Sequence, residues 1–210
     1  MPEATSLAGR AALDEEAARK EIEARPAAER TADEVTALAR GRVVAKRKEL
    51  AQLARKITLL PKVVKEDKEL AARLKELHSD REIATDTLRM YASLPGITGP
   101  DLLYGVLSSG KKSDVTDLAE ALLYAKDVRS KASPALASLL ELRKSEQCED
   151  VKKALGEVTK SADRRAVIPL MKYENKFGCG EKKKDDCWAC LRDGDLLKEA
   201  QKAIQKRPAP

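Results

Sequence analysis

The chain has few aromatic residues, one histidine and no long apolar run. Aromatic side chains make up 3% of its 210 residues, and all of them lie beyond residue 90. A single histidine, His78, leaves no Ser/His/Asp set to assemble. We expect His78 to end a helix, where an imidazolium ion stabilises the C-terminal dipole. Because no stretch of about 18 apolar residues is present, we also expect no membrane-spanning segment in this chain.

Strand patterns are scarce, whereas signals for helix ends are frequent. No alternating run of β-branched residues lies between turn signals. Ser113 and Ser133, the latter followed by proline, are typical of helix N-termini. Residues 79–82, Ser-Asp-Arg-Glu, form a predicted capping box, residues 94–96 predict a helix end, and Gly110 a second one. The sequence therefore predicts an all-α fold, an irregular array of short antiparallel helices.

Large apolar residues are concentrated in the last two thirds of the chain, and this distribution predicts three parts. An N-terminal arm, helical or partly disordered, covers residues 1–62. A helical repeat-like body follows over 63–176, and residues 177–210 form a cysteine-rich cap with a final helix and a tail. Because the first 60 residues hold no aromatic residue, we expect the rest to fold without them.

Three segments of the body begin alike: DREIATDTL at Asp80, DVRSKASPAL at Asp127 and DRRAVIPL at Asp163. Their offsets of 47 and 36 residues bracket the period of HEAT and armadillo repeats. The starts at Asp127 and Asp163 resemble the opening of the second helix in HEAT repeats. This resemblance implies an α-solenoid with a concave face for protein partners. An unrelated helical bundle is the alternative.

The four cysteines, Cys148, Cys179, Cys187 and Cys190, all lie beyond residue 147. Two disulfides would staple the cap to the body, and the favoured pairing joins Cys148 to Cys179 and Cys187 to Cys190. Zinc is the alternative, because Cys187 and Cys190 have the spacing of one ligand pair, although the other two cysteines are far apart. Free buried thiols are a further possibility. In each case we expect a structural role for these residues.

A redox couple at Cys187 and Cys190 is not expected. Thioredoxin-like chemistry needs a βαβ scaffold, which the sequence does not predict. Asp185 and Asp186 also precede Cys187 and disfavour its thiolate. The segments SEQCEDV, FGCG and DDCWACLR resemble the extracytoplasmic C-terminal region of some bacterial serine/threonine kinases, although the kinase motifs themselves are missing. Paired cysteines favour an extracytoplasmic location, as part of a longer or processed chain, over a cytoplasmic one.

Charge suggests a solvated surface rather than a nucleic-acid site. The chain has 41 Lys and Arg against 35 Asp and Glu, a net charge of +6. Acids and bases alternate closely, as in KEDKELAARLKELHSDRE, and this pattern is typical of exposed helix faces. We therefore predict a non-catalytic scaffold that binds a protein partner and carries no cofactor. The alternative is a zinc-stabilised, basic nucleic-acid-binding module.

Overall fold

The structure, a computed structural model, describes residues 5–13, 15–109 and 111–207. These residues fold into thirteen α-helices and four short 3-10 helices, and within them the only β contact is an isolated bridge between Cys179 and Asp185. The all-α prediction is therefore confirmed. Gly110, the predicted helix end, lies outside the described residues.

The chain forms two compact units, Met1–Val128 (unit 1) and Arg129–Pro210 (unit 2). The boundary between them falls inside the segment 63–176, which the sequence predicts as one helical body. Each unit has its own buried residues, and each is described separately below.

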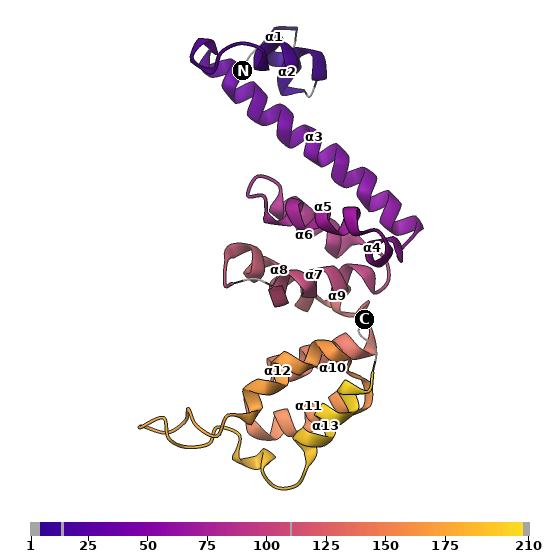
Figure 1. Ribbon diagram of the computed structural model, residues 1–210, viewed down its shortest axis with the longest axis vertical. Coiled ribbons are helices and arrows are strands. Elements are labelled where there is room, and N and C mark those ends of the chain that lie inside the picture. Colours follow the sequence, from indigo (N-terminus) through magenta and orange to yellow (C-terminus); the bar gives the residue numbers. More distant parts are fainter. Residues whose placement is uncertain (1–4, 14, 110, 208–210) are drawn as a thin grey trace. The chain divides into compact units, whose positions relative to one another are not determined.

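The first part of unit 1 is built on one long helix. It holds α1 (Leu7–Ala12), α2 (Glu16–Glu23), the 3-10 helix η1 (Ala27–Glu29) and α3 (Ala32–Leu59), and α1 and α2 lie at the N-terminal end of α3 (Figure 1). Thr31 begins α3 with a capping box, in which its hydroxyl accepts from the Glu34 amide and the Glu34 carboxylate accepts from the Thr31 amide. Gly41 allows α1 to pack closely on α3, because a Cβ at this position would overlap the carbonyl oxygen of Ala11.

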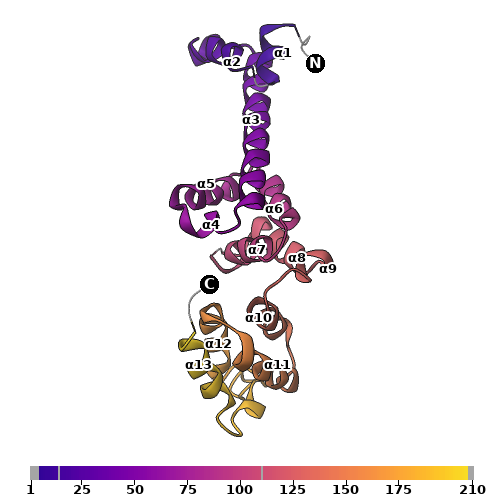
Figure 2. The same ribbon diagram turned by 90° about the vertical axis from the view of Figure 1, so that its right-hand side faces the viewer.

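Consecutive short helices form the rest of unit 1. They are α4 (Val63–Glu66), α5 (Lys68–Ser79), α6 (Ala84–Ser93), α7 (Thr98–Ser109) and α8 (Asp114–Tyr124), followed by α9 (Lys126–Arg129), whose last residue is the first of unit 2. Helices α5, α6 and α7 lie side by side at the C-terminal end of α3 in both views (Figure 1 and Figure 2). The hydroxyl of Ser113 caps α8, and α6 ends at Ser93, just before the predicted stop at 94–96. These two predictions are confirmed.

Two predictions about unit 1 are wrong. Leu50 on α3 is buried in one cluster with Leu77 and Ile83, so the C-terminal half of α3 belongs to the core and the first 60 residues are not separate from it. The predicted capping box at residues 79–82 does not form, because α5 continues to Ser79 and α6 begins only at Ala84. The Asp80 carboxylate accepts the Glu82 amide in the turn between these helices instead.

Unit 2 is arranged around α11. It contains α10 (Pro134–Lys144), α11 (Cys148–Ser161), η2 (Arg164–Ala166), α12 (Val167–Met171), η3 (Lys172–Glu174), η4 (Ala189–Leu191) and α13 (Leu196–Gln205). Helix α11 contacts α10, α13 and η4, and Ser133 caps α10 as predicted. At the other end of α11, the Arg207 guanidinium donates to the carbonyl oxygens of Thr159 and Ala162. Arg207 therefore satisfies backbone groups that a helix C-terminus leaves open.

Candidate functional site

The four cysteines form two disulfides, one between Cys148 and Cys190 and one between Cys179 and Cys187. The predicted pairing is therefore wrong. Cys148 is the first residue of α11, and η4 packs against that helix, so Cys190 lies beside Cys148 with their Cα atoms 6.0 Å apart. Cys179 instead meets Cys187 within a local hairpin, at a Cα separation of 5.1 Å.

Backbone hydrogen bonds close this hairpin. The amide of Cys179 donates to the carbonyl of Asp185 at 3.0 Å, and the amide of Asp185 donates back to the carbonyl of Cys179 at 3.0 Å. Gly180 has a φ of +74°, a backbone conformation that favours glycine. The loop projects from the helices of unit 2 (Figure 1). The two hydrogen bonds and the disulfide between Cys179 and Cys187 bring the ends of the loop together.

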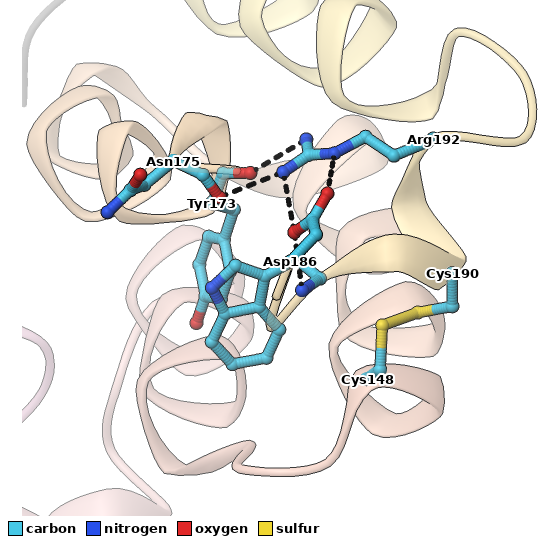
Figure 3. Close-up of a disulfide and its surroundings, with 7 residues drawn as sticks. Cys148, Tyr173, Asn175, Asp186, Cys190 and Arg192 are labelled. Atoms are coloured by element: carbon cyan, nitrogen blue, oxygen red, sulfur yellow. Dashed lines mark hydrogen bonds and ion pairs between the residues drawn. A yellow bond between two sulfur atoms is a disulfide. The ribbon is translucent and has the colours of Figure 1, made fainter. Parts of the chain in front are cut away.

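Arg192 ties the cap to the preceding helices (Figure 3). Its guanidinium donates to the Asp186 carboxylate at 2.6 Å and to the carbonyl oxygens of Tyr173 at 3.0 Å and Asn175 at 2.9 Å. This hydrogen-bonded pair lowers the pKa of Asp186. The same carboxylate accepts a hydrogen bond from the amide of Trp188, a residue that is 8% exposed. The Trp188 ring packs edge-on to the Tyr173 ring, with their centroids 4.8 Å apart. These contacts bury the only tryptophan of the chain.

The arrangement of the sulfur atoms bears on the zinc alternative. A four-cysteine zinc site needs all four sulfurs as thiolates, and here each sulfur is bonded to another. Over residues 5–13, 15–109 and 111–207, no three His, Cys, Asp or Glu side chains are grouped so that they could hold a metal ion. The geometry therefore favours disulfides, and a stabilising role for the four cysteines stays our prediction.

Unit 1 contains a groove that the sequence did not reveal. It has a volume of about 590 Å³ and lies between α4, α5, α6 and α7. Its lining is largely apolar and includes Val64, Leu74, Ile97, Leu102 and Val106. The sequence shows these residues only as separate apolar positions on different helices, so the groove depends on how the helices pack.

One edge of the groove is open and apolar. Ile97, which lies between α6 and α7, is 50% exposed and lines the groove. Leu59 and Leu60 are 79% and 61% exposed and directly precede Pro61, another lining residue. Exposed apolar groups that continue a hollow in this way are typical of binding surfaces. We therefore take this groove as the candidate functional site, and we call it the α4–α7 groove.

Three lysines, Lys62, Lys65 and Lys75, also line the α4–α7 groove, whereas Asp101 is the single carboxylate among the lining residues that the structure describes. The lining of the groove therefore carries an excess of positive charge. Gly105 on α7 lines the groove as well, and a Cβ placed there would meet no atom within 4 Å. The space over Gly105 is open.

His78 lies in the wall of the groove, near the end of α5. Its Nδ1 atom is 3.4 Å from the hydroxyl oxygen of Tyr91, and that hydroxyl donates to the carbonyl of Leu74 at 3.1 Å. Burial, with a smaller contribution from the nearby Lys75, lowers the pKa of His78. His78 does lie in the last turn of α5, as predicted, but its burial disfavours the cationic form that the predicted interaction with the helix dipole needs.

Comparison with known proteins does not assign the chain to a family. No protein-family model, no curated protein and no solved structure matches the chain. The resemblances to HEAT repeats and to bacterial kinase C-terminal regions therefore stay predictions. Among the helices in the described part of the chain, none has both the length and the apolar character needed to cross a membrane.

Proposed function

We propose that the protein is a non-catalytic interaction module that binds an α-helical segment of a partner protein in the α4–α7 groove. The observation that carries this proposal is the groove itself, a largely apolar hollow of about 590 Å³ with the half-exposed Ile97 at its edge. Its volume lies in the range of specific ligand sites. An amphipathic helix places apolar side chains at i, i+3, i+4 and i+7 into such grooves.

The setting of His78 supports a binding role without catalysis. A histidine that acts as a general base needs a nucleophile within hydrogen-bond reach and a group that orients its ring. His78 instead lies against Tyr91, whose hydroxyl hydrogen bonds to the Leu74 carbonyl. The neighbouring helix contacts, α5 with α6, α6 with α7 and α7 with α8, also agree with a stacked, HEAT-like arrangement, which we include in this proposal.

The disulfides support an extracytoplasmic location. Unit 2 holds two of them, and stable disulfides form in oxidising compartments. A zinc-stabilised nucleic-acid-binding module is not supported by the same observations, because the sulfurs are paired and many cations lie in ion pairs, among them Lys46 with Asp80. We therefore retain the protein-binding function alone.

The proposal can be tested with a display library of helix-forming peptides. The peptides differ in the position of their apolar stripe and in their charge. Selection on the full chain should enrich peptides with apolar residues at helical spacing. Fluorescence anisotropy of the enriched peptides should then show affinity reduced about tenfold or more by Gly105→Leu, whose side chain would occupy the groove.

Gly156→Leu is the matched control, because Gly156 is also helical and also has open space at its Cβ, but lies on α11 in unit 2. We expect this variant to bind like the original chain. A library that yields no helical binder, or binders unaffected by Gly105→Leu, would overturn the proposed function.

A further inference from the structure

We infer that the helix bound in the α4–α7 groove is acidic, with carboxylates flanking its apolar stripe. This inference rests on the proposed function and names the chemical class of its partner. It comes from the three lysines that line the groove, Lys62, Lys65 and Lys75.

These lysines differ from other cations of unit 1. Lys56 pairs with Asp67 at 3.0 Å, and Arg73 pairs with Glu49 at 2.7 Å. Within the part of the chain that the structure describes, Lys62, Lys65 and Lys75 form no ion pair with a carboxylate. Acids and bases are closely interleaved in this region of the sequence, so acidic side chains are available nearby. Because the three lysines around the apolar groove nevertheless form no ion pair among the described residues, they can bind carboxylates of a partner.

The lysines come from two of the helices that line the groove. Lys62 and Lys65 lie at the start of α4 and within it, and Lys75 lies on α5. The apolar floor includes Leu102 and Val106 on α7. A helix whose apolar stripe packs against these residues can present glutamates beside the stripe to the ammonium groups of the lining lysines. Opposite charges placed in this way favour the correct partner and speed its encounter.

A long-chain fatty acid has similar chemistry, an apolar chain and a carboxylate, but fits the observations less well. The groove has an open edge at Ile97, which is 50% exposed, whereas apolar small-molecule sites bury most of the ligand surface. A fatty acid also brings one negative charge to three lysines. An acidic helix can supply several carboxylates along the length of the groove.

Three peptides with one apolar stripe and different flanking residues test the inference. The stripe comes from the library selection, and the flanks carry Glu, Gln or Lys. We expect affinity for the full chain to fall in the order Glu, Gln, Lys, with at least about tenfold between the first and last at low salt. The preference should shrink as salt is raised, because ions screen exposed charges.

A second test of the inference reverses the charge of lysines in the groove. Lys65→Glu combined with Lys75→Glu should weaken the Glu peptide about tenfold or more and strengthen the Lys peptide. The control combines Lys182→Glu and Lys184→Glu, which make the same change of charge on exposed residues of the unit 2 hairpin. It should leave the order unchanged.

The outcomes separate this inference from the proposed function. Equal affinity for the three peptides, with binding still lost in Gly105→Leu, overturns the acidic partner and keeps the groove as a helix site. The inference is also overturned if the control variant changes the affinities of the three peptides as much as Lys65→Glu with Lys75→Glu does. Only the net charge of the chain would then matter. Sodium palmitate that binds more tightly than the Glu peptide and displaces it assigns the lysines to a fatty acid and overturns the acidic helix.

Discussion

Replacing Cys148 and Cys190 by serine should destabilise unit 2 more than replacing Cys179 and Cys187. The first disulfide joins residues 42 positions apart, from the start of α11 to η4, and the second joins residues 8 positions apart in the hairpin. A cross-link restrains the unfolded chain more when the loop that it closes is longer. The two double variants remove the same number of sulfur atoms, so loop length is the main difference between them.

The loop-entropy relation gives the expected size of the effect. A loop of 42 residues corresponds to about 4 kcal/mol and one of 8 residues to about 2.5 kcal/mol at 25 °C. Loss of the longer cross-link should therefore lower the free energy of unfolding by about 1.5 kcal/mol more than loss of the shorter one. The Arg192 hydrogen bonds to Asp186, Tyr173 and Asn175 remain in both variants, so they should not change this difference.

Urea unfolding followed by tryptophan fluorescence measures the effect in the correct unit. Trp188 is the only tryptophan, and it is 8% exposed beside Tyr173. A third variant, Cys148→Ser with Cys179→Ser, breaks both disulfides if the pairing is as the structure has it, but only one if these two residues are partners. Its unfolding free energy should fall by more than that of either other pair. Equal unfolding free energies for the two variants that each lack one disulfide would refute the reasoning. So would a third variant that is no less stable than these two.

Three further predictions concern unit 1. Gly41→Ala should cost about 1–3 kcal/mol, because the new methyl group overlaps the Ala11 carbonyl, and faster hydrogen exchange in residues 7–12 should report it. The pKa of His78 is lower in the folded state than in the unfolded state, so stability should fall as the pH drops below about 6.5, and His78→Gln should flatten the profile between pH 7 and 5. A chain that begins at residue 61 should lose the calorimetric transition of unit 1, because it lacks the buried Leu50 and Ile57, whereas one that begins at residue 31 should keep this transition.

Local chemistry made the helices predictable. Ser113 and Ser133 each accept an amide three residues ahead, a hydrogen bond that needs no distant residue. The prediction at Ser79 failed because the apolar stripe of α5 continues through the buried Leu77, so packing extends the helix past the expected start of the next one. Capping signals therefore predict a helix end well only where no neighbouring apolar stripe competes.

The groove depends on contacts that the sequence does not encode locally. Its lining comes from α4, α5, α6 and α7, so residues as far apart in the sequence as Lys62 and Val106 line one groove. In the sequence, Lys65 and Lys75 stand among alternating acids and look like part of a solvated face. Only the folded chain shows which cations have carboxylate partners and which do not. The unpaired lysines therefore carry information that the charge pattern hides.

The cysteine pairing shows how a local signal can be present and still be misread. The spacing of Cys187 and Cys190 suggested that they pair with each other, but glycines flank Cys179, and both have positive φ angles, +124° at Gly178 and +74° at Gly180. These glycines let residues 179–185 turn back through the bridge between Cys179 and Asp185, and the turn delivers Cys179 to Cys187. Cys190 then remains for Cys148, at the start of the amphipathic helix on which η4 packs. The two glycines beside Cys179, which the prediction did not use, are the local feature that agrees with the observed pairing.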